Sequence, residues 1–353
     1  MENRFDVVVI GGGQAGLALG YHLARGRLRY VIFDAAPRVG HVWRTRWDSL
    51  TLFTPARYSA LPGLPFPGDP EHYPGKDAVA DYLERYAATF DLPVRLDTRV
   101  TALRPLPGGA GFEIDAGAAR YTADQVVVAT GPFQLPYVPG LARDLAPDVV
   151  QLHSAEYRNP DQLPPGPVLV VGAGNSGVQI AEELAPTRPT WLSVGVKLPR
   201  LPARLLGRSI FWWLEKTGLM NVTADSWLGR QMRARDPLIG SSPEMVARRL
   251  GVRVVGRTER AEGDCVFTRE GEEVRVASVV WATGFRSDYG WIEAPVLDRD
   301  GRPIHRRGVT PVPGLYFLGL SWQHTRGSAL IGWVGRDAEY LADQIGRRAT
   351  GGA

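Results

Sequence analysis

Two glycine-rich segments built to the same design constrain this chain more than any other feature. VVVIGGGQAGL spans residues 7–17, and LVVGAGNSGVQ spans residues 169–179. Each is an apolar, largely β-branched run followed by glycines spaced G-x-G-x-x-G, which predicts a buried parallel strand, a tight turn and a helix. Such a turn presents free backbone N–H groups to the pyrophosphate of a dinucleotide. The pair therefore predicts an α/β chain with two Rossmann-like dinucleotide-binding domains.

The first segment belongs to a complete strand–helix–strand unit. Gly11 permits the tight turn, Gly13 lets a pyrophosphate approach the backbone, and Gly16 lets the helix pack on the strand. The helix is predicted from about Gln14, and the next strand, YVIFD, ends in Asp34. A carboxylate at that point is placed to accept a hydrogen bond from a ribose hydroxyl. The strand, the turn, the helix and the acid together predict one dinucleotide site.

The second segment repeats this unit. Gly172, Gly174 and Gly177 take the three glycine positions, and a helix is predicted over about residues 175–185. Asn175 and Ser176 lie on the turn, where we expect them to cap the helix and contact a pyrophosphate.

The acid that should follow the second unit is missing. After a strand predicted over about residues 190–196, no carboxylate occurs, and Lys197, Arg200 and Arg204 come instead. A carboxylate would repel a 2′-phosphate, whereas cations attract it. We therefore expect the second site to accept NADPH and not to be restricted to NADH. The alternative is that Arg200 and Arg204 are only surface charges.

A further pair of repeats follows the two glycine turns. VVVATGPF spans residues 126–133 and VVWATGF spans residues 279–285. Their recurrence in the same order, each downstream of a glycine turn, indicates an internal duplication of a nucleotide-binding plan.

With these motifs in place, the chain resembles the class B flavin-containing monooxygenases, close to the short bacterial members. The resemblance covers nearly the whole chain, through GGGQAGL, GHVWRTRWDSLTLFTPARYSALPG, LHSAEYRNP, VVGAGNSGVQIAEEL, the two ATG segments and GLYFLGLSW with GSALIGWVGRDAEYL. One family motif, F-x-G-x-x-x-H-x-x-x-W/F/Y, is only half present. His153 and Tyr157 match it, but Pro147 and Val149 replace its Phe and Gly, so the type of oxygen transfer stays open.

The resemblance implies that the second domain is inserted in the first. It places a discontinuous FAD-binding domain at residues 1–160 and 287–353, and an NAD(P)H-binding domain at residues 161–286 with a helical insertion over about residues 205–250. A proline-rich linker, RNPDQLPPGP at residues 158–167, is consistent with the first crossing between them.

The resemblance also implies the residues of each site. For FAD these are Gly11, Gly13, Gln14, Ala15, Gly16, Asp34, Ala35, Val42, Trp43, Leu52, Thr54, Val100, Ala129, Thr130, Gly131, Gly319, Ala329, Leu330 and Ile331. For NADPH they are Gly172, Gly174, Asn175, Ser176, Gly177, Gln179, Lys197, Arg200, Thr283 and Gly284.

No catalytic side chain is assigned, because a flavin carries the hard chemistry while the protein positions and shields it. Trp43, Phe53 and Thr54 are candidates for the neighbourhood of the flavin ring, although Trp43 and Phe53 are about as well explained as core aromatics. For His153 the alternatives are a catalytic acid or base role and a structural hydrogen bond between the domains, and we favour the structural one. No metal-ligand cluster stands out.

The activity implied by the resemblance is NADPH- and O2-dependent oxygenation. Hydride passes from NADPH, with NADH as an alternative donor, to FAD, and O2 then gives a C4a-hydroperoxyflavin that oxygenates a soft nucleophile such as a sulfide or an amine. Baeyer–Villiger oxidation of a ketone, an NAD(P)H:flavin oxidoreductase with a separate electron acceptor, and a flavoprotein sensor without turnover remain alternatives. A disulfide reductase is disfavoured because Cys265 is the only cysteine.

Composition bears on partners and location. The formal charge of +4 comes from arginines spread along the chain, so we expect a small-molecule substrate and no nucleic acid. No apolar run approaches ~18 residues and no room for a signal peptide precedes the first strand, so we expect a cytoplasmic protein with no transmembrane segment. A homodimer stays open.

The segment at residues 205–238 is the least explained. Its cluster Phe211, Trp212, Trp213 and Leu214 can cover a substrate cleft, form a dimer face or dip into a membrane surface. We favour core packing of an inserted helix.

Overall fold

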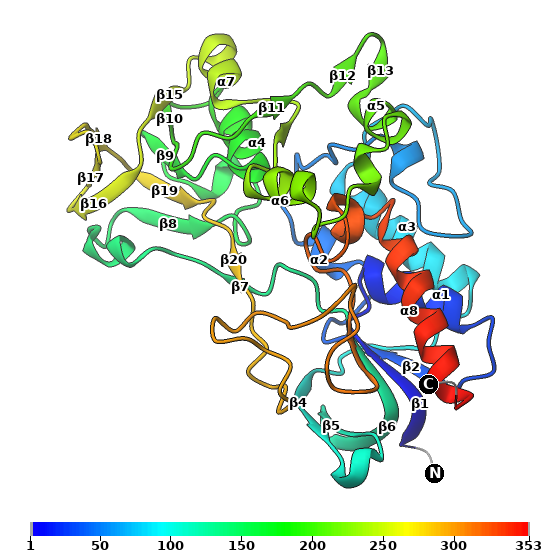
Figure 1. The fold of residues 1–353 in the computed structure, drawn as a ribbon. Coiled ribbons are helices and arrows are strands. Elements are labelled where there is room, and N and C mark those ends of the chain that lie inside the picture. Colours follow the sequence, from blue (N-terminus) through cyan, green and yellow to red (C-terminus); the bar gives the residue numbers. More distant parts are fainter. Residues whose placement is uncertain (1–2, 352–353) are drawn as a thin grey trace.

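Two sheets flanked by helices organise the computed structural model, which describes residues 3–351 (Figure 1). Within that range the first sheet has seven strands, in the order β3-β2-β1-β6-β5-β4, with β21 beside the second half of β6. Its strands are β1 (Arg4–Ile10), β2 (Tyr30–Phe33), β3 (Val94–Arg95), β4 (Val100–Pro105), β5 (Phe112–Ala116), β6 (Ala119–Val128) and β21 (Leu315–Phe317).

Helices α1 (Gln14–Leu23), α3 (Lys76–Thr89) and α8 (Val334–Ala349) cover one face of this sheet (Figure 1). Val7 and Val9 of β1 point into that core, as the alternating geometry of a strand requires, while Val8 and Ile10 face the other side. There the antiparallel strands β4 and β5 and the segment around Ile292 close a second core. The shorter elements of this half are α2 (His41–Arg44), η1 (Ala56–Tyr58), η2 (Pro107–Gly109) and η6 (Arg326–Ala329).

The second sheet is parallel throughout, in the order β15-β10-β9-β19-β8. Its strands are β8 (Val150–His153), β9 (Val168–Val171), β10 (Thr190–Ser193), β15 (Arg253–Val255) and β19 (Ser278–Trp281). Strand β8 thus joins this sheet although it precedes residue 161, where we expect the second domain to begin. Helices α4 (Asn175–Leu184) and α7 (Pro243–Leu250) pack beside it, and an antiparallel sheet of β16 (Thr258–Glu262), β17 (Cys265–Thr268) and β18 (Glu273–Arg275) follows.

The chain passes from the first sheet to the second between β6 and β8, and returns between β19 and β21. These two crossings meet in a short antiparallel pair, β7 (Leu135–Pro136) with β20 (Phe285–Arg286). The short 3-10 helix η3 (Gly140–Asp144) lies on the first crossing, and η4 (Pro160–Gln162) lies between β8 and β9 of the second sheet. The predicted α/β fold with two Rossmann-like sheets is confirmed.

The insertion after β10 reaches across to the first half of the molecule, at the upper right of Figure 1. It holds β11 (Arg200–Leu201), β12 (Arg204–Leu205), β13 (Arg208–Ser209), α5 (Ile210–Lys216), η5 (Leu219–Asn221), α6 (Trp227–Ala234) and β14 (Leu238–Ile239). Phe211 and Leu214 are buried in one cluster with Trp333, which precedes α8. Core packing is therefore the role of these two side chains, whereas Trp212 and Trp213 stay half-buried.

Candidate functional site

The first glycine turn has the shape of a dinucleotide cradle. A Cβ on Gly11, whose φ is +113°, would lie 2.4 Å from the carbonyl oxygen of Ala129, and one on Gly16 would lie 1.9 Å from the carbonyl oxygen of Gly11. Both glycines are therefore required by the fold itself. A Cβ on Gly13 would meet no atom within 4 Å, so the open space there is left for a ligand. The turn fits the pyrophosphate of FAD.

Asp34 lies beside this turn at the end of β2. Its Oδ2 accepts a hydrogen bond from the backbone N–H of Gly12 at 2.6 Å, and its Oδ1 accepts one from Ala36 at 2.8 Å. The carboxylate is half-exposed, and each of its oxygens has further lone pairs for a ribose hydroxyl. Ala35 is exposed next to it.

The C-terminal segment is brought to the same turn. Gln14 Nε2 donates to the carbonyl oxygen of Ala329 at 3.4 Å, and a Cβ on Gly319 would lie 2.8 Å from that of Ala15. The predicted residues 329–331 thus lie near the start of α1, although more than 300 positions separate them in the chain. Helix α8 begins at Val334, shortly after residues 329–331.

The residues expected near the flavin ring differ in their burial and in their contacts. Thr54 is buried, and its Oγ1 lies 2.9 Å from the hydroxyl of Ser59. Trp43 and Leu52 are half-buried against the first core, whereas the Val42 side chain is exposed. Phe53 stacks on Phe211 of the insertion, with ring centroids 6.0 Å apart and planes at 16°.

The first ATG loop follows β6 and adjoins the first glycine turn, since a Cβ on Gly11 would lie 3.1 Å from the backbone nitrogen of Thr130, whereas Val100 lies on β4. Val100 begins β4 and pairs with Ala116. Thr130 accepts a hydrogen bond from Gln134 Nε2 at 3.0 Å, and Gly131 has a φ of +73°.

The second glycine turn reproduces the first. A Cβ on Gly172 would lie 2.4 Å from the carbonyl oxygen of Ala282, one on Gly177 would lie 1.8 Å from that of Gly172, and one on Gly174 would meet nothing within 4 Å. Ala129 and Ala282 are the alanines of the two ATG segments, so turn and ATG strand are duplicated together. The second turn also fits a pyrophosphate.

The capping role that we predicted for Asn175 and Ser176 is wrong. Gly174 is the N-cap of α4 and no side chain caps it. Asn175 Oδ1 instead accepts a hydrogen bond from the backbone N–H of Ile239 at 3.1 Å, because β14 of the insertion lies beside the turn. Ser176 is half-exposed on the first turn of the helix.

The cations after β10 are exposed. Lys197 Nζ lies 3.7 Å from Glu244, with 85% of its side chain exposed, and Arg200 donates to the carbonyl oxygen of Gly240. Arg204 is paired with Glu71 of the first half, which leaves it less free for a ligand. Sequence reasoning missed Arg257, whose Cγ would lie 3.9 Å from a Cβ on Gly195. The loop after β15, distant in sequence, brings it there, and no nearby motif signals it.

A cavity of about 210 Å³ joins the two halves. Thr51, Leu52 and Phe53 line it from the first half, and Asn175 and Gln179 line it from the second. Gln179 Nε2 also donates to the carbonyl oxygen of Thr51 at 3.4 Å. The start of α4, which carries the second glycine turn, therefore adjoins the segment expected along the flavin.

Further lining residues of this cavity were missed from the sequence: Tyr73, Val178, Glu182, Ala203, Ile239, Gly240 and Ser241. Burial raises the pKa of Tyr73, so its hydroxyl is neutral at physiological pH. Glu182 accepts a hydrogen bond from Ser241.

His153 is buried between the domains. Its Nδ1 accepts from the backbone N–H of Ala155 at 3.1 Å, so Nε2 carries the proton and donates to the carbonyl oxygen of Gly284 at 3.0 Å. Burial lowers its pKa, which favours this neutral form. Thr283 likewise donates to the carbonyl oxygen of Tyr137. These contacts fit the structural hydrogen bond that we favour for His153.

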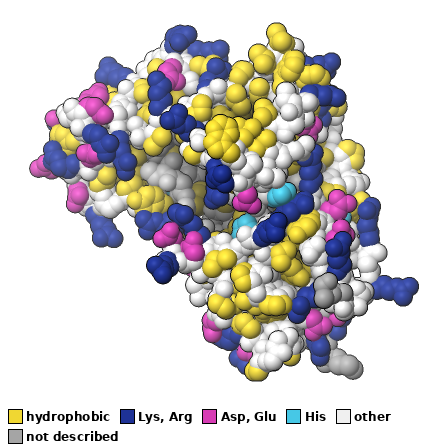
Figure 2. All heavy atoms as spheres, viewed as in Figure 1, with side chains coloured by type: hydrophobic (Ala, Val, Ile, Leu, Met, Phe, Trp, Pro, Cys, Tyr) yellow, Lys and Arg dark blue, Asp and Glu magenta, His cyan; other side chains and the backbone are white. Residues whose placement is uncertain are grey.

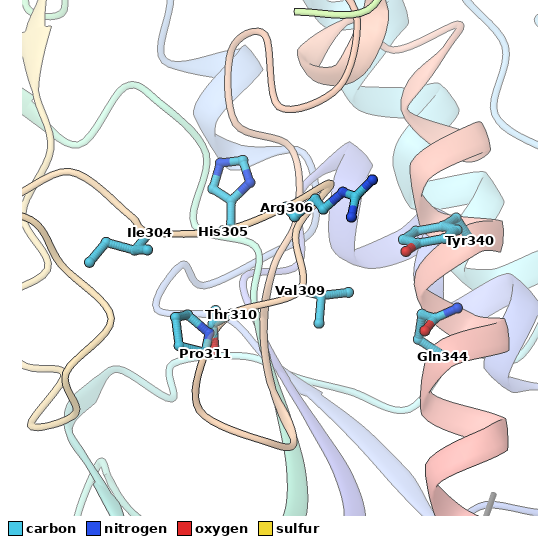
Figure 3. Close-up of a pocket in the computed structure, with 8 residues that line it drawn as sticks. All are labelled: Ile304, His305, Arg306, Val309, Thr310, Pro311, Tyr340 and Gln344. Carbon is cyan, nitrogen blue, oxygen red and sulfur yellow. The ribbon is translucent and has the colours of Figure 1, made fainter. Parts of the chain in front are cut away.

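A larger hollow of about 520 Å³ lies elsewhere, between the loop at residues 304–311 and the side of α8 (Figure 3). Tyr340 and Gln344 extend from the helix toward the loop that carries His305 and Arg306 (Figure 3). The hollow is open to solvent, and none of the residues expected at FAD or NADPH lines it.

On the face in Figure 2, charged side chains are distributed without a single dominant sign. Lys and Arg side chains are scattered among acidic and apolar ones on the face in Figure 2, without a continuous basic stripe. Among residues 3–351, no helix combines the length and the apolar character needed to cross a bilayer. The same residues contain no group of His, Cys, Asp and Glu suited to a metal ion.

Comparison with known proteins agrees with this architecture. A family model described as pyridine nucleotide-disulphide oxidoreductase matches residues 8–189. An uncharacterized CzcO-like oxidoreductase of Geobacillus kaustophilus is 50% identical over 347 residues, which cover 98% of this chain and 99% of that protein. A probable indole-3-pyruvate monooxygenase of Arabidopsis thaliana, YUCCA8, is 28% identical over 96% of this chain and 88% of that protein.

Among solved structures, the flavin-containing monooxygenase from Stenotrophomonas maltophilia is 29% identical. It superposes with a TM-score of 0.82 over 98% of this chain and 99% of that chain. The similarity therefore extends over both sheets and the insertion, not over a single nucleotide-binding unit.

Proposed function

Because this chain belongs to the class B flavin-containing monooxygenases, within the pyridine nucleotide-disulphide oxidoreductases, we propose that it oxygenates a soft nucleophile such as a sulfide or an amine. It is a flavin-dependent oxidoreductase, and its cofactors are FAD and NADPH. We further propose which residues hold FAD and NADPH, and that NADH is an alternative hydride donor.

One observation carries the proposal: a single cavity is lined by the start of the second glycine helix and by the segment expected along the flavin. Asn175 and Gln179 belong to the second glycine helix, and Leu52 and Phe53 belong to the segment expected along the flavin. Hydride transfer requires the reacting atoms of donor and acceptor to approach to about 3–3.5 Å. A shared cavity supports such an approach, whereas two sites on opposite faces would not.

For FAD, the supporting residues are those of the first turn. The N–H groups at the start of α1 would face the pyrophosphate over Gly13, and the Asp34 carboxylate would accept from the adenosine ribose. Bound FAD supplies the redox chemistry, including the activation of O2.

For NADPH, the second turn and the cations beyond β10 are the supporting residues. Gly174 leaves room for the pyrophosphate, and Lys197, Arg200 and Arg257 offer positive charge where a strict NAD site has a carboxylate. We also propose the domain limits expected from the sequence, at residues 160 and 287. Strand β8 is an addition to the second domain, because it joins the second sheet although it precedes residue 160.

The chain's own task is to hold the two cofactors together and keep water out. Phe53, Tyr58, Phe211 and Trp333 form an aromatic wall contributed by the first half and the insertion. Excluding water from such a site suppresses the loss of reactive intermediates as H2O2. The neutral hydroxyl of Tyr73 can donate a hydrogen bond without acting as a general base at neutral pH.

The activity is tested by mixing the purified protein with NADPH, air and methyl phenyl sulfide. We expect a yellow protein that forms methyl phenyl sulfoxide in excess of H2O2. Stoichiometric H2O2 with no oxygenated product from sulfides, amines or ketones would refute the oxygenase proposal and favour an oxidoreductase with a separate acceptor. A lactone from cyclohexanone, with no sulfoxide or amine oxide, would favour Baeyer–Villiger oxidation instead.

A further inference from the structure

We propose that Arg46 is a positioning residue. Its guanidinium contacts both interdomain crossings, a contact that we call the clamp, and so fixes the orientation of the nicotinamide site relative to the flavin site. The inference rests on the proposed function for its catalytic consequence, but the clamp itself is a property of the protein alone.

Arg46 lies beside two phenylalanines, Phe133 and Phe285, each of which closely follows one of the two ATG segments. Its Cζ is 5.4 Å from the ring centroid of Phe133 and 5.4 Å from that of Phe285. The two rings meet edge to face with centroids 5.3 Å apart, and the His153 ring meets Phe285 edge to face at 5.0 Å. Both distances from the guanidinium lie within the reach of a cation–π interaction. One cation therefore contacts both halves of the duplication.

The charge of Arg46 is compensated by these rings and not by an acid. Among the described residues no carboxylate forms an ion pair with it, and no acceptor receives a hydrogen bond from its guanidinium. Burial and the neighbouring Arg158 lower its pKa, so its surroundings oppose the charge. A half-buried cation beside another cation is costly unless something replaces its hydration. The ring faces of Phe133 and Phe285 replace part of the hydration of the guanidinium.

The two phenylalanines mark the crossings between the sheets. Phe133 leads into β7, and Phe285 opens β20, which pairs with β7. The carbonyl oxygen of Gly284 accepts from the backbone N–H of Tyr137 at 3.0 Å, which ties the crossings again. Arg46 approaches from a third segment, between α2 and α3 of the first half. Arg46 therefore contacts both crossings from a segment outside the β7–β20 pair.

The segment that carries Arg46 is itself anchored in the second domain. Trp47 and Leu50 are buried in the cluster that contains Val170 and Val280 of the second sheet. The backbone N–H of Asp48 donates to the carbonyl oxygen of Arg158 at 2.7 Å. The guanidinium is therefore held at the point where both domains and both crossings meet, which suits a residue that sets their mutual orientation.

Hydride transfer is sensitive to such an orientation, since a misplacement of about 1 Å can cost about 100-fold in rate. Loss of the clamp should slow flavin reduction at saturating NADPH without preventing either cofactor from binding. A cation that instead bound a cofactor phosphate would change affinity and leave the saturated rate nearly intact.

The clamp is tested first without turnover. Arg46→Met keeps the length and apolar contact of the side chain and removes its charge, and Arg299→Met is the matched control at an exposed arginine outside the crossings. We expect hydrogen–deuterium exchange to become faster over residues 131–137 and 284–289 in Arg46→Met only. Unchanged protection of both crossings would overturn the proposal.

The positioning role is tested by anaerobic stopped-flow reduction of the FAD-loaded protein with NADPH. We expect Arg46→Met to lower the saturated reduction rate by about tenfold or more while its Kd for NADPH changes by less than about threefold, and Arg46→Lys to recover part of the rate. Loss confined to Kd would show that Arg46 binds cofactor. Dithionite should reduce the variant as it reduces the wild-type protein.

Phe133→Leu keeps the test decisive if Arg46→Met folds poorly, because Phe133 is 61% exposed and its loss spares the core. The same faster exchange and a smaller loss of reduction rate are expected in Phe133→Leu, and unchanged exchange over both crossings would overturn the proposal. Wild-type protein that NADPH does not reduce would sink the proposed function, whereas the exchange measurement would still decide whether the clamp exists.

Discussion

Phe211 of the insertion lies against Trp333 of the first half, with ring centroids 5.4 Å apart and planes tilted by 35°. The Trp333 indole N–H also donates to Glu215 Oε1 at 3.0 Å, and Glu215 lies 3.7 Å from Arg336. An inserted segment of the nicotinamide half is thus attached to the segment that leads into α8. This contact is part of the aromatic wall, which reaches the cavity through Phe53.

Replacing Phe211 with Ala should destabilise the protein by about 3–5 kcal/mol, because the side chain is fully buried and a cavity would remain. Thermal unfolding monitored by circular dichroism should show the decrease. Trp227→Ala, at a side chain 70% exposed, is the control and should change stability by no more than about 0.5 kcal/mol. The opposite ranking of the two variants would mean that α5 is not docked.

Gly13→Val should give a folded protein that does not retain FAD. The backbone of Gly13, at φ −78° and ψ −172°, is open to any residue, and its added Cβ would meet no protein atom, so only the ligand would be displaced. Visible absorbance of the purified protein measures the bound flavin. Gly16→Val should instead fail to fold, since its Cβ would lie 1.9 Å from a carbonyl oxygen. A yellow Gly13→Val protein would contradict the placement of the pyrophosphate.

Gly174→Val should keep the yellow colour and weaken NADPH. Gly174 has the same open geometry as Gly13, so the change should act on the second cofactor alone. Each lost hydrogen bond to a charged phosphate is worth about 1.5–3 kcal/mol, so Kd for NADPH should rise by roughly tenfold or more. Titration of flavin reduction gives this Kd, and an unchanged value would remove the second turn from the site.

Removing the cations at Lys197 and Arg200 together, as Met, should raise KM for NADPH by about threefold to thirtyfold and leave KM for NADH nearly unchanged. The range allows for the exposure of both side chains, which screens their attraction for a phosphate. Arg204→Met, at a guanidinium already paired with Glu71, is the matched control. Equal losses with both cofactors would exclude a 2′-phosphate role. Arg257→Met should behave like the first pair.

Acid should destabilise the interdomain contact through His153. Burial lowers its pKa, so the unfolded chain takes up a proton at higher pH than the folded protein does. The stability linked to this group is fully present above the ordinary pKa of 6.5 and decreases as the pH falls below it. The protonated ring can no longer accept from the Ala155 N–H.

We expect the melting temperature to fall between pH 7.5 and pH 5.5, and to fall less in His153→Gln, which does not titrate. Burial also lowers the pKa of His22, His305 and His324, so the variant should keep part of the pH dependence. An identical decrease in the two proteins would exclude His153 as a contributor.

Local sequence was sufficient to predict both glycine turns, the strands before them and the helices after them. At Gly11 and Gly172 the reason is steric, since a Cβ there would lie 2.4 Å from the carbonyl oxygen of the neighbouring ATG strand. The duplication could be inferred because the glycine turns and the ATG segments recur in the same order along the chain. The prediction for Asn175 failed where a segment distant in sequence, β14, supplied the partner of the amide.

The sequence by itself therefore determined two strand–turn–helix units and the glycines that each turn requires. It also determined that Asp34 follows the first unit and that no carboxylate follows the second. Only the tertiary structure decided how these units meet. It packs Trp47 into the core of the second sheet, brings Ala329 to Gln14, and sets Arg46 beside Phe133 and Phe285. Turn geometry follows from the steric limits of a few adjacent residues, whereas contacts between distant segments depend on the packing of whole domains, which no local periodicity encodes.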